Sequence, residues 1–228
     1  MGADTASAAT ALPTLIVAVG ALGTAAFGLV DTLKVLPGGG ISRTGFKFIR
    51  KTILTLAPEV SSLDGTGLSR KSMLFTLESQ WINGTDTASQ INIAKSLVKL
   101  RLTPDTAAAL ATATAVDGAV LSAIATNILS GTPLTPQQSD VYGRFDVLLT
   151  SLLDQAYQRA DQRYRNATKF AAVPISVALA VAAAYTIPGF SVGKAVLIGL
   201  IATPIAPIAK DLASGIQTAV QALQAWKP

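Results

Sequence analysis

The fold of this chain is decided by residues 170–193, whose sequence is FAAVPISVALAVAAAYTIPGFSVG and contains no charged side chain. At a rise of about 1.5 Å per residue, roughly 20 apolar helical residues cross the hydrocarbon core of a bilayer. Pro188 and Gly189 near the end of the stretch are typical of a turn. A further apolar run, residues 195–209, follows directly. Two apolar runs joined by a turn predict a transmembrane helical hairpin over residues 170–209.

Another apolar run, ALPTLIVAVGALGTAAFGLV, occupies residues 11–30 near the N-terminus. The segment before it has no Lys or Arg, and the run is longer than the roughly 7–15 apolar residues of a signal peptide. We therefore expect a first transmembrane helix within an N-terminal part of residues 1–36. Gly20, Thr24 and Gly28 recur at every fourth position, which predicts a helix-packing face made of small residues.

The composition also indicates a membrane protein without catalytic chemistry. Hydrophobic residues make up 50% of the chain and charged residues 14%, against about 25% charged in ordinary soluble domains. The chain has no Cys and no His, which excludes thiolate and imidazole metal ligands and every Ser–His or Cys–His nucleophile pair. The glycines after Pro37 are not followed by the Lys-Ser or Lys-Thr of a phosphate-binding loop. We expect no enzyme activity, no cofactor and no metal site.

Residues 37–169 carry repeated helix-start signals and no alternating strand pattern, so the fold class is all-α. Expected helices begin near Ser69, at Thr87 (a capping box with Gln90), at Thr103 (followed by Pro104) and at Thr135 (a capping box with Gln138). A break is expected near Asp117 and Gly118. After Pro136 no stop signal occurs before Ile187, which predicts one continuous helix over residues 136–187.

Basic residues gather beside the apolar runs. The net charge is +5, and residues 41–56 interleave cations with apolar residues, which predicts an amphipathic helix at the headgroup layer. The expected headgroup contacts are Arg43, Lys47, Arg50, Lys51, Arg159, Arg163, Arg165 and Lys169. Nucleic acid is not expected as a partner, because the cations are not gathered on one face with aromatic residues.

The same cations predict the orientation in the membrane. Cytoplasmic loops are enriched in Lys and Arg, and these residues are concentrated between the first and second apolar runs. We expect an integral protein of a bacterial inner membrane, with the N-terminus outside, residues 37–169 as a helical cytoplasmic domain, and the C-terminus in the cytoplasm.

The C-terminal part contains two prolines followed by an amphipathic pattern. Pro204 and Pro207 interrupt the third apolar run, and a proline inside a helix removes a hydrogen bond and kinks it, so we expect a hinge there. Residues 210–228 are expected to form an amphipathic helix. Its apolar stripe comprises Ile208, Leu212, Ile216, Ala219, Val220 and Leu223, with Trp226 close behind.

Two functional hypotheses follow for an all-α integral membrane protein with three transmembrane helices. The first is a non-catalytic assembly or scaffold subunit, whose partners are the lipid bilayer and either copies of itself or other membrane subunits. The alternative is an oligomeric pore or channel with a proline-kinked third helix. The first is favoured because no apolar run carries a polar stripe suited to lining a wide pore.

Overall fold

The computed structural model describes residues 3–32, 40–60, 63 and 65–225, and within these ranges the chain is helical, with no strand. The expectation of an all-α fold is therefore confirmed. The chain divides into two compact units. We call residues 39–164 the helical unit, and residues 1–38 together with 165–228 the apolar unit. Lys34, Pro37 and Trp226, which the sequence analysis singled out, lie outside the described residues.

The helical unit consists of five short helices and the first part of a long one. They are α2 (Ser42–Leu56), α3 (Arg70–Ile82), α4 (Thr87–Leu100), α5 (Pro104–Thr114), α6 (Gly118–Ser130) and α7 (Pro136–Ala184). One apolar core joins them, and the fully buried Ile49, Leu77, Leu110 and Leu149 belong to it. The expected break near Asp117 separates α5 from α6, and the side chain of Asp117 accepts a hydrogen bond from the Val120 amide.

The capping signals explain where most of these helices begin. Ser69 caps α3, and Thr103 caps α5 in a reciprocal arrangement with Thr106. At α7 the expected capping box is present, because the Gln138 amide donates to the Thr135 hydroxyl and the Thr135 amide donates to the Gln138 side chain.

The expected capping box at Thr87 is wrong by one residue. Asp86 is the N-cap of α4, where its carboxylate accepts a hydrogen bond from the Ser89 amide. The side chain of Gln90 turns back and donates to the Thr85 carbonyl. Aspartate and threonine both satisfy the amides at a helix start, so the earlier of two adjacent capping residues begins the helix here.

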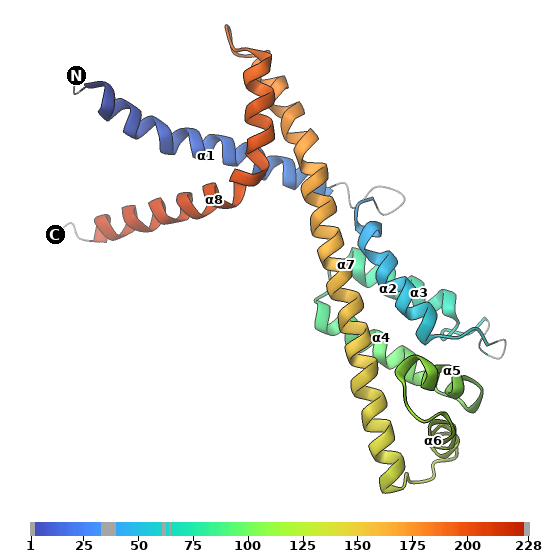
Figure 1. The fold of residues 1–228 in the computed structure, drawn as a ribbon. Helices are drawn as coiled ribbons and strands as arrows, with labels where there is room; N and C mark the ends of the chain where they lie inside the picture. Colours follow the sequence, from blue (N-terminus) through green and yellow to red (C-terminus); the bar gives the residue numbers. More distant parts are fainter. Residues whose placement is uncertain (1–2, 33–39, 61–62, 64, 226–228) are drawn as a thin grey trace. The chain divides into compact units, whose positions relative to one another are not determined.

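The apolar unit contains α1 (Ala3–Thr32), the remainder of α7 and α8 (Val192–Ala225) (Figure 1). All three helices are long and apolar enough to cross a membrane. Large apolar side chains remain exposed along them, including Leu15, Phe170 and Leu197. Exposed apolar surface of this kind marks contact with lipid or with another chain, and the finding indicates a membrane protein.

Small residues bring the helices of the apolar unit into direct contact. A Cβ atom placed on Gly23 would lie 2.2 Å from the Ala202 carbonyl oxygen, and one on Gly20 would lie 1.9 Å from the Ala209 Cβ. A Cβ on Gly199 of α8 would lie 2.5 Å from the Val177 Cα of α7. These glycines therefore set the closest approach of α8 to its two neighbours, as small residues do in membrane helix packing.

Both long helices continue through their prolines. Helix α7 contains Pro174 and ends at Ala184, three residues before the expected end at Ile187. Helix α8 contains Pro204 and Pro207, and Figure 1 shows a sharp bend in it between its orange part and the red part that leads to the C-terminus. Residues 210–225 thus extend α8 instead of forming a separate helix. The side chains of Leu212, Ile216 and Leu223 lie outside the described part.

Candidate functional site: a basic groove between two helices

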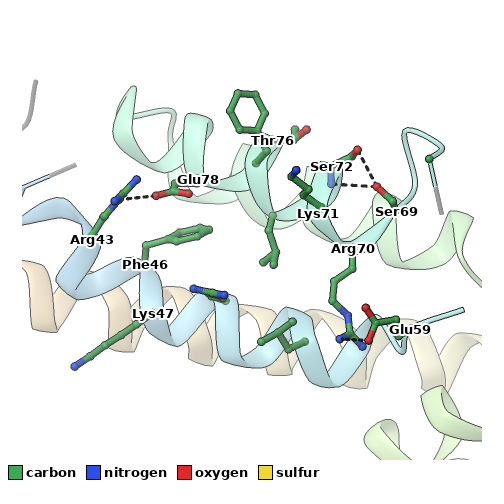
Figure 2. A pocket seen from close by; sticks show the side chains of 15 residues that line it. Arg43, Phe46, Lys47, Glu59, Ser69, Arg70, Lys71, Ser72, Thr76 and Glu78 are labelled. Carbon is green, nitrogen blue, oxygen red and sulfur yellow. Dashed lines mark hydrogen bonds and ion pairs between the residues drawn. The ribbon is translucent and has the colours of Figure 1, made fainter. Parts of the chain in front are cut away.

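The candidate site is a groove of about 1210 Å³ in the helical unit, between α2 and α3 (Figure 2). Five cations line it, Arg43, Lys47 and Arg50 from α2 and Arg70 and Lys71 from α3, against the two acids Glu59 and Glu78. Helix spacing explains the α2 set, because positions three and four apart lie on one helix face. The groove therefore carries an excess of positive charge.

An ion pair stands at each end of the groove. Arg43 Nε lies 2.9 Å from Glu78 Oε1, and Arg70 Nη1 lies 3.4 Å from Glu59 Oε2. Figure 2 shows the two pairs at opposite ends, each with an arginine from one helix and its acid at the other side of the gap. Arg70 Nε also donates to the Ala57 carbonyl at 2.9 Å. These contacts orient both guanidinium groups.

The groove also has an apolar component. Phe46 is almost fully buried and points from α2 towards α3, whereas the Lys47 side chain leaves α2 on the side away from α3 (Figure 2). Phe75 of α3 is 72% exposed, and it lines the same groove. An exposed aromatic ring beside several cations offers both apolar and electrostatic contact to a ligand.

A buried arginine binds the backbone just after α2 and just before α3, next to the two walls of the groove. Arg101 is almost completely buried, and its guanidinium donates to the carbonyls of Pro58 and Leu68. Pro58 follows the end of α2 and Leu68 precedes α3. Hydrogen bonds from one charged group to these two carbonyls hold the end of α2 and the start of α3 close to Arg101.

The predicted headgroup residues fall into two sets. Arg43, Lys47 and Arg50 line the groove together, while Lys51 is exposed on α2 and is not part of the lining. The second set, Arg159, Arg163, Arg165 and Lys169, is exposed along α7. Sequence reasoning did not include Arg70, Lys71 and Phe75 in the site. The Arg-Lys pair at the start of α3 was the available signal, but its partner helix lies in a different part of the sequence.

The predicted packing residues differ in their surroundings. Gly20 is buried against Ala209 of α8, as described above. Thr24 is exposed and its hydroxyl donates to the Gly20 carbonyl at 3.0 Å. A Cβ on Gly28 would have nothing within 4 Å. Among the described residues of α1, Gly20 and Gly23 lie against α8, and the face with Thr24 and Gly28 stays a prediction for contact with another helix.

The predicted hinge prolines lie beside a buried polar contact. The Ser176 hydroxyl of α7 lies 2.7 Å from the Gly199 carbonyl oxygen and 3.2 Å from the Thr203 hydroxyl of α8. Pro207 has no amide hydrogen to donate to the Thr203 carbonyl one turn earlier. The polar link between α7 and α8 therefore lies within a turn of both prolines. Whether Pro204 and Pro207 act as a hinge stays a prediction.

Among the residues that the structure describes, no group of three or more acidic side chains could hold a metal ion. Comparison with protein-family models, with curated proteins and with solved structures found no match. Functional inference therefore rests on the geometry of the two units.

Proposed function

We propose that the protein is a non-catalytic integral membrane subunit that assembles with copies of itself or with other membrane proteins and presents the helical unit as a scaffold. The observation that carries the proposal is the packing of the apolar unit. Gly20, Gly23 and Gly199 bring its three helices into backbone contact, while large apolar side chains stay exposed outside. Such a unit is suited to anchoring and to lateral association.

The same packing argues against a pore inside one chain. The contacts at Gly23 and Gly199 leave no space for an additional methyl group, and the buried hydroxyls of Ser176 and Thr203 satisfy each other and a carbonyl. The alternative, a pore or channel, would need several copies around a shared axis. Its lining would then come from the exposed faces, as in channels with apolar constrictions.

The proposal predicts a homo-oligomer that uses the exposed small-residue face of α1. Gly28→Leu should abolish or reduce the oligomer, because a large side chain prevents close helix approach, and it should leave the chain folded because Gly28 has open space around it. The measurement is native mass spectrometry of the full chain released from lipid nanodiscs. Each copy of the chain in the oligomer adds 23.4 kDa to the measured mass.

The control variant is Ala18→Leu, which adds a comparable side chain at another exposed position of α1. It should retain the wild-type mass. A wild-type protein that remains a monomer at every lipid ratio, with no second subunit in its native membrane, would contradict the assembly role. Ion conductance in liposomes by a homo-oligomer would favour the pore instead.

A further inference from the structure

The groove between α2 and α3 has cations that its own acids do not neutralise. Glu78 pairs with Arg43 and Glu59 pairs with Arg70. Arg50 and Lys71 line the same groove and have no acidic partner within 4 Å among the described residues. Lys47 is a third such cation of the lining, and its ammonium lies 5.5 Å from the Phe48 ring.

We propose that this groove is a binding site for the phosphate headgroup of an anionic phospholipid. Guanidinium groups bind phosphate oxygens through paired hydrogen bonds, and ammonium groups bind them as point charges. Arg50 and Lys71 would contact the phosphate directly. Arg43 and Arg70 are already oriented by their acids. From the two ends of the groove they would add positive electrostatic potential and further hydrogen-bond donors.

Two observations favour a lipid over a soluble phosphate compound as the occupant. Phe75 is 72% exposed at the groove, and a lipid supplies the glycerol and acyl groups that would cover its ring. Helix α2 also follows the first candidate span after residues 33–41, a connection that extends over at most about 32 Å. The groove is thus carried by a segment tethered close to a bilayer, where anionic headgroups are concentrated.

The assignment rests on the apolar unit and on the groove, and it is independent of the proposed assembly role. A protein that fails to form oligomers can still bind the lipid. Oligomer mass is read after release from nanodiscs and bound lipid is counted in detergent, so failure of one proposal is distinguishable from failure of the other.

The test titrates the full chain in detergent with phosphatidylglycerol and, separately, with phosphatidylcholine of the same acyl chains, and counts bound lipids by native mass spectrometry. We expect one phosphatidylglycerol to bind more tightly than phosphatidylcholine. Arg50→Gln/Lys71→Gln should weaken that binding by about 25-fold, since each cation near an anionic surface contributes roughly a fivefold factor.

Two further double variants make the result specific. Arg144→Gln/Lys194→Gln removes the same charge from exposed positions outside the groove lining, and it should change binding by less than about threefold at moderate salt because exposed charges that do not contact the lipid are screened. Glu59→Gln/Glu78→Gln removes the acids of the groove and should tighten binding. A variant that merely fails to fold would not show this gain.

Three outcomes would overturn the proposal. Equal weakening by the groove pair and the control pair would mean general attraction to a basic surface. Displacement of the lipid by inorganic phosphate at equal concentration would mean that the site recognises a free phosphate group instead. Binding of a polyglutamate peptide, lost in Arg50→Gln/Lys71→Gln, without any preference for phosphatidylglycerol would identify a docking site for an acidic protein segment.

Discussion

Asp146 of α7 links two lysines of α4 in the helical unit. Its Oδ1 lies 2.6 Å from Lys99 Nζ, and its Oδ2 lies 3.5 Å from Lys95 Nζ. The hydrogen bond from Lys99 holds the pKa of the Asp146 carboxyl below its usual value, although burial opposes this. Burial works to lower the pKa of Lys99, but the hydrogen bond to Asp146 and the electrostatic effects of Tyr142 and Asp146 outweigh it and raise that pKa.

These shifts predict how the cluster responds to acid. Because the pKa of Asp146 is lower in the folded than in the unfolded chain, its contribution to stability is present above the unfolded pKa of about 4 and is lost as pH falls through the folded pKa. Asp146→Asn should lower the free energy of unfolding by about 0.5–1 kcal/mol at pH 7, the upper range for partly exposed pairs. At pH 3 the difference from wild type should be smaller.

The measurement is urea unfolding of the full chain in one detergent, followed by circular dichroism between pH 7 and pH 3. Asp140→Asn is the matched control, because Asp140 is exposed on the same helix and no ion pair is found for it among the described residues. It should change stability by less than about 0.3 kcal/mol. An Asp146→Asn effect that is the same at both pH values would refute the electrostatic explanation.

At the scale of elements, the crossing of α2 over α7 depends on one glycine. A Cβ atom on Gly45 would lie 2.5 Å from the Ala160 carbonyl oxygen and 2.8 Å from the Trp81 ring. Trp81 is held in place, since its indole Nε1 donates to the Ser42 carbonyl at 2.9 Å. Neither the backbone nor the ring can move away without disturbing a packed contact.

Gly45→Ala should therefore destabilise the helical unit by up to about 2 kcal/mol, because overpacking costs about 1–3 kcal/mol and alanine recovers about 1 kcal/mol of helix propensity. Gly143→Ala is the matched control within α7, where the new methyl group meets nothing within 4 Å. It should stabilise the protein by about 0.5–1 kcal/mol. Thermal unfolding followed by circular dichroism measures both, and equal changes of the same sign would refute the close-contact argument.

Local signals in the sequence were sufficient to predict single helices but not their partners. The absence of stop signals after Pro136 predicted the continuous α7, and the Thr103-Pro104 start predicted α5. The four-residue row of Gly20, Thr24 and Gly28 indicated a close-packing face on α1. The structure places Gly20 and Gly23 against α8. Which face of a helix is buried depends on where the neighbouring helix lies, and the spacing of residues in the sequence does not give that position.

The groove illustrates the same limit. The amphipathic pattern of residues 41–56 was enough to identify Arg43, Lys47 and Arg50 as neighbours, since residues three and four apart lie on one helix face. Arg70 and Lys71 join them only because α2 and α3 pack side by side through their buried faces. Capping was predictable to within one residue at α4, where Asp86 and Thr87 compete for the same amides.

At the scale of the whole molecule, the distribution of cations predicts which side of the membrane each part occupies. The cations between the first and second candidate spans favour the cytoplasm for residues 39–164. Three spans place the two termini on opposite sides, so the N-terminal tail and the turn after α7 are expected outside. The chain contains no Cys, so a thiol-reactive reagent labels this protein only at a single introduced Cys.

The orientation predicts the labelling of four variants by a membrane-impermeant maleimide on intact bacterial cells. Ser7→Cys in the tail and Ser191→Cys in the turn between α7 and α8 should react directly, because both are expected outside. Ser151→Cys in the helical unit and Ser214→Cys in α8 should react only after lysis, although both positions are exposed. Reaction of Ser151→Cys and Ser214→Cys alone would invert the topology. Protection of Ser191→Cys in intact cells with labelling after lysis would mean that α7 and α8 do not cross the bilayer as a hairpin, and the anchoring role of the apolar unit would have to be abandoned.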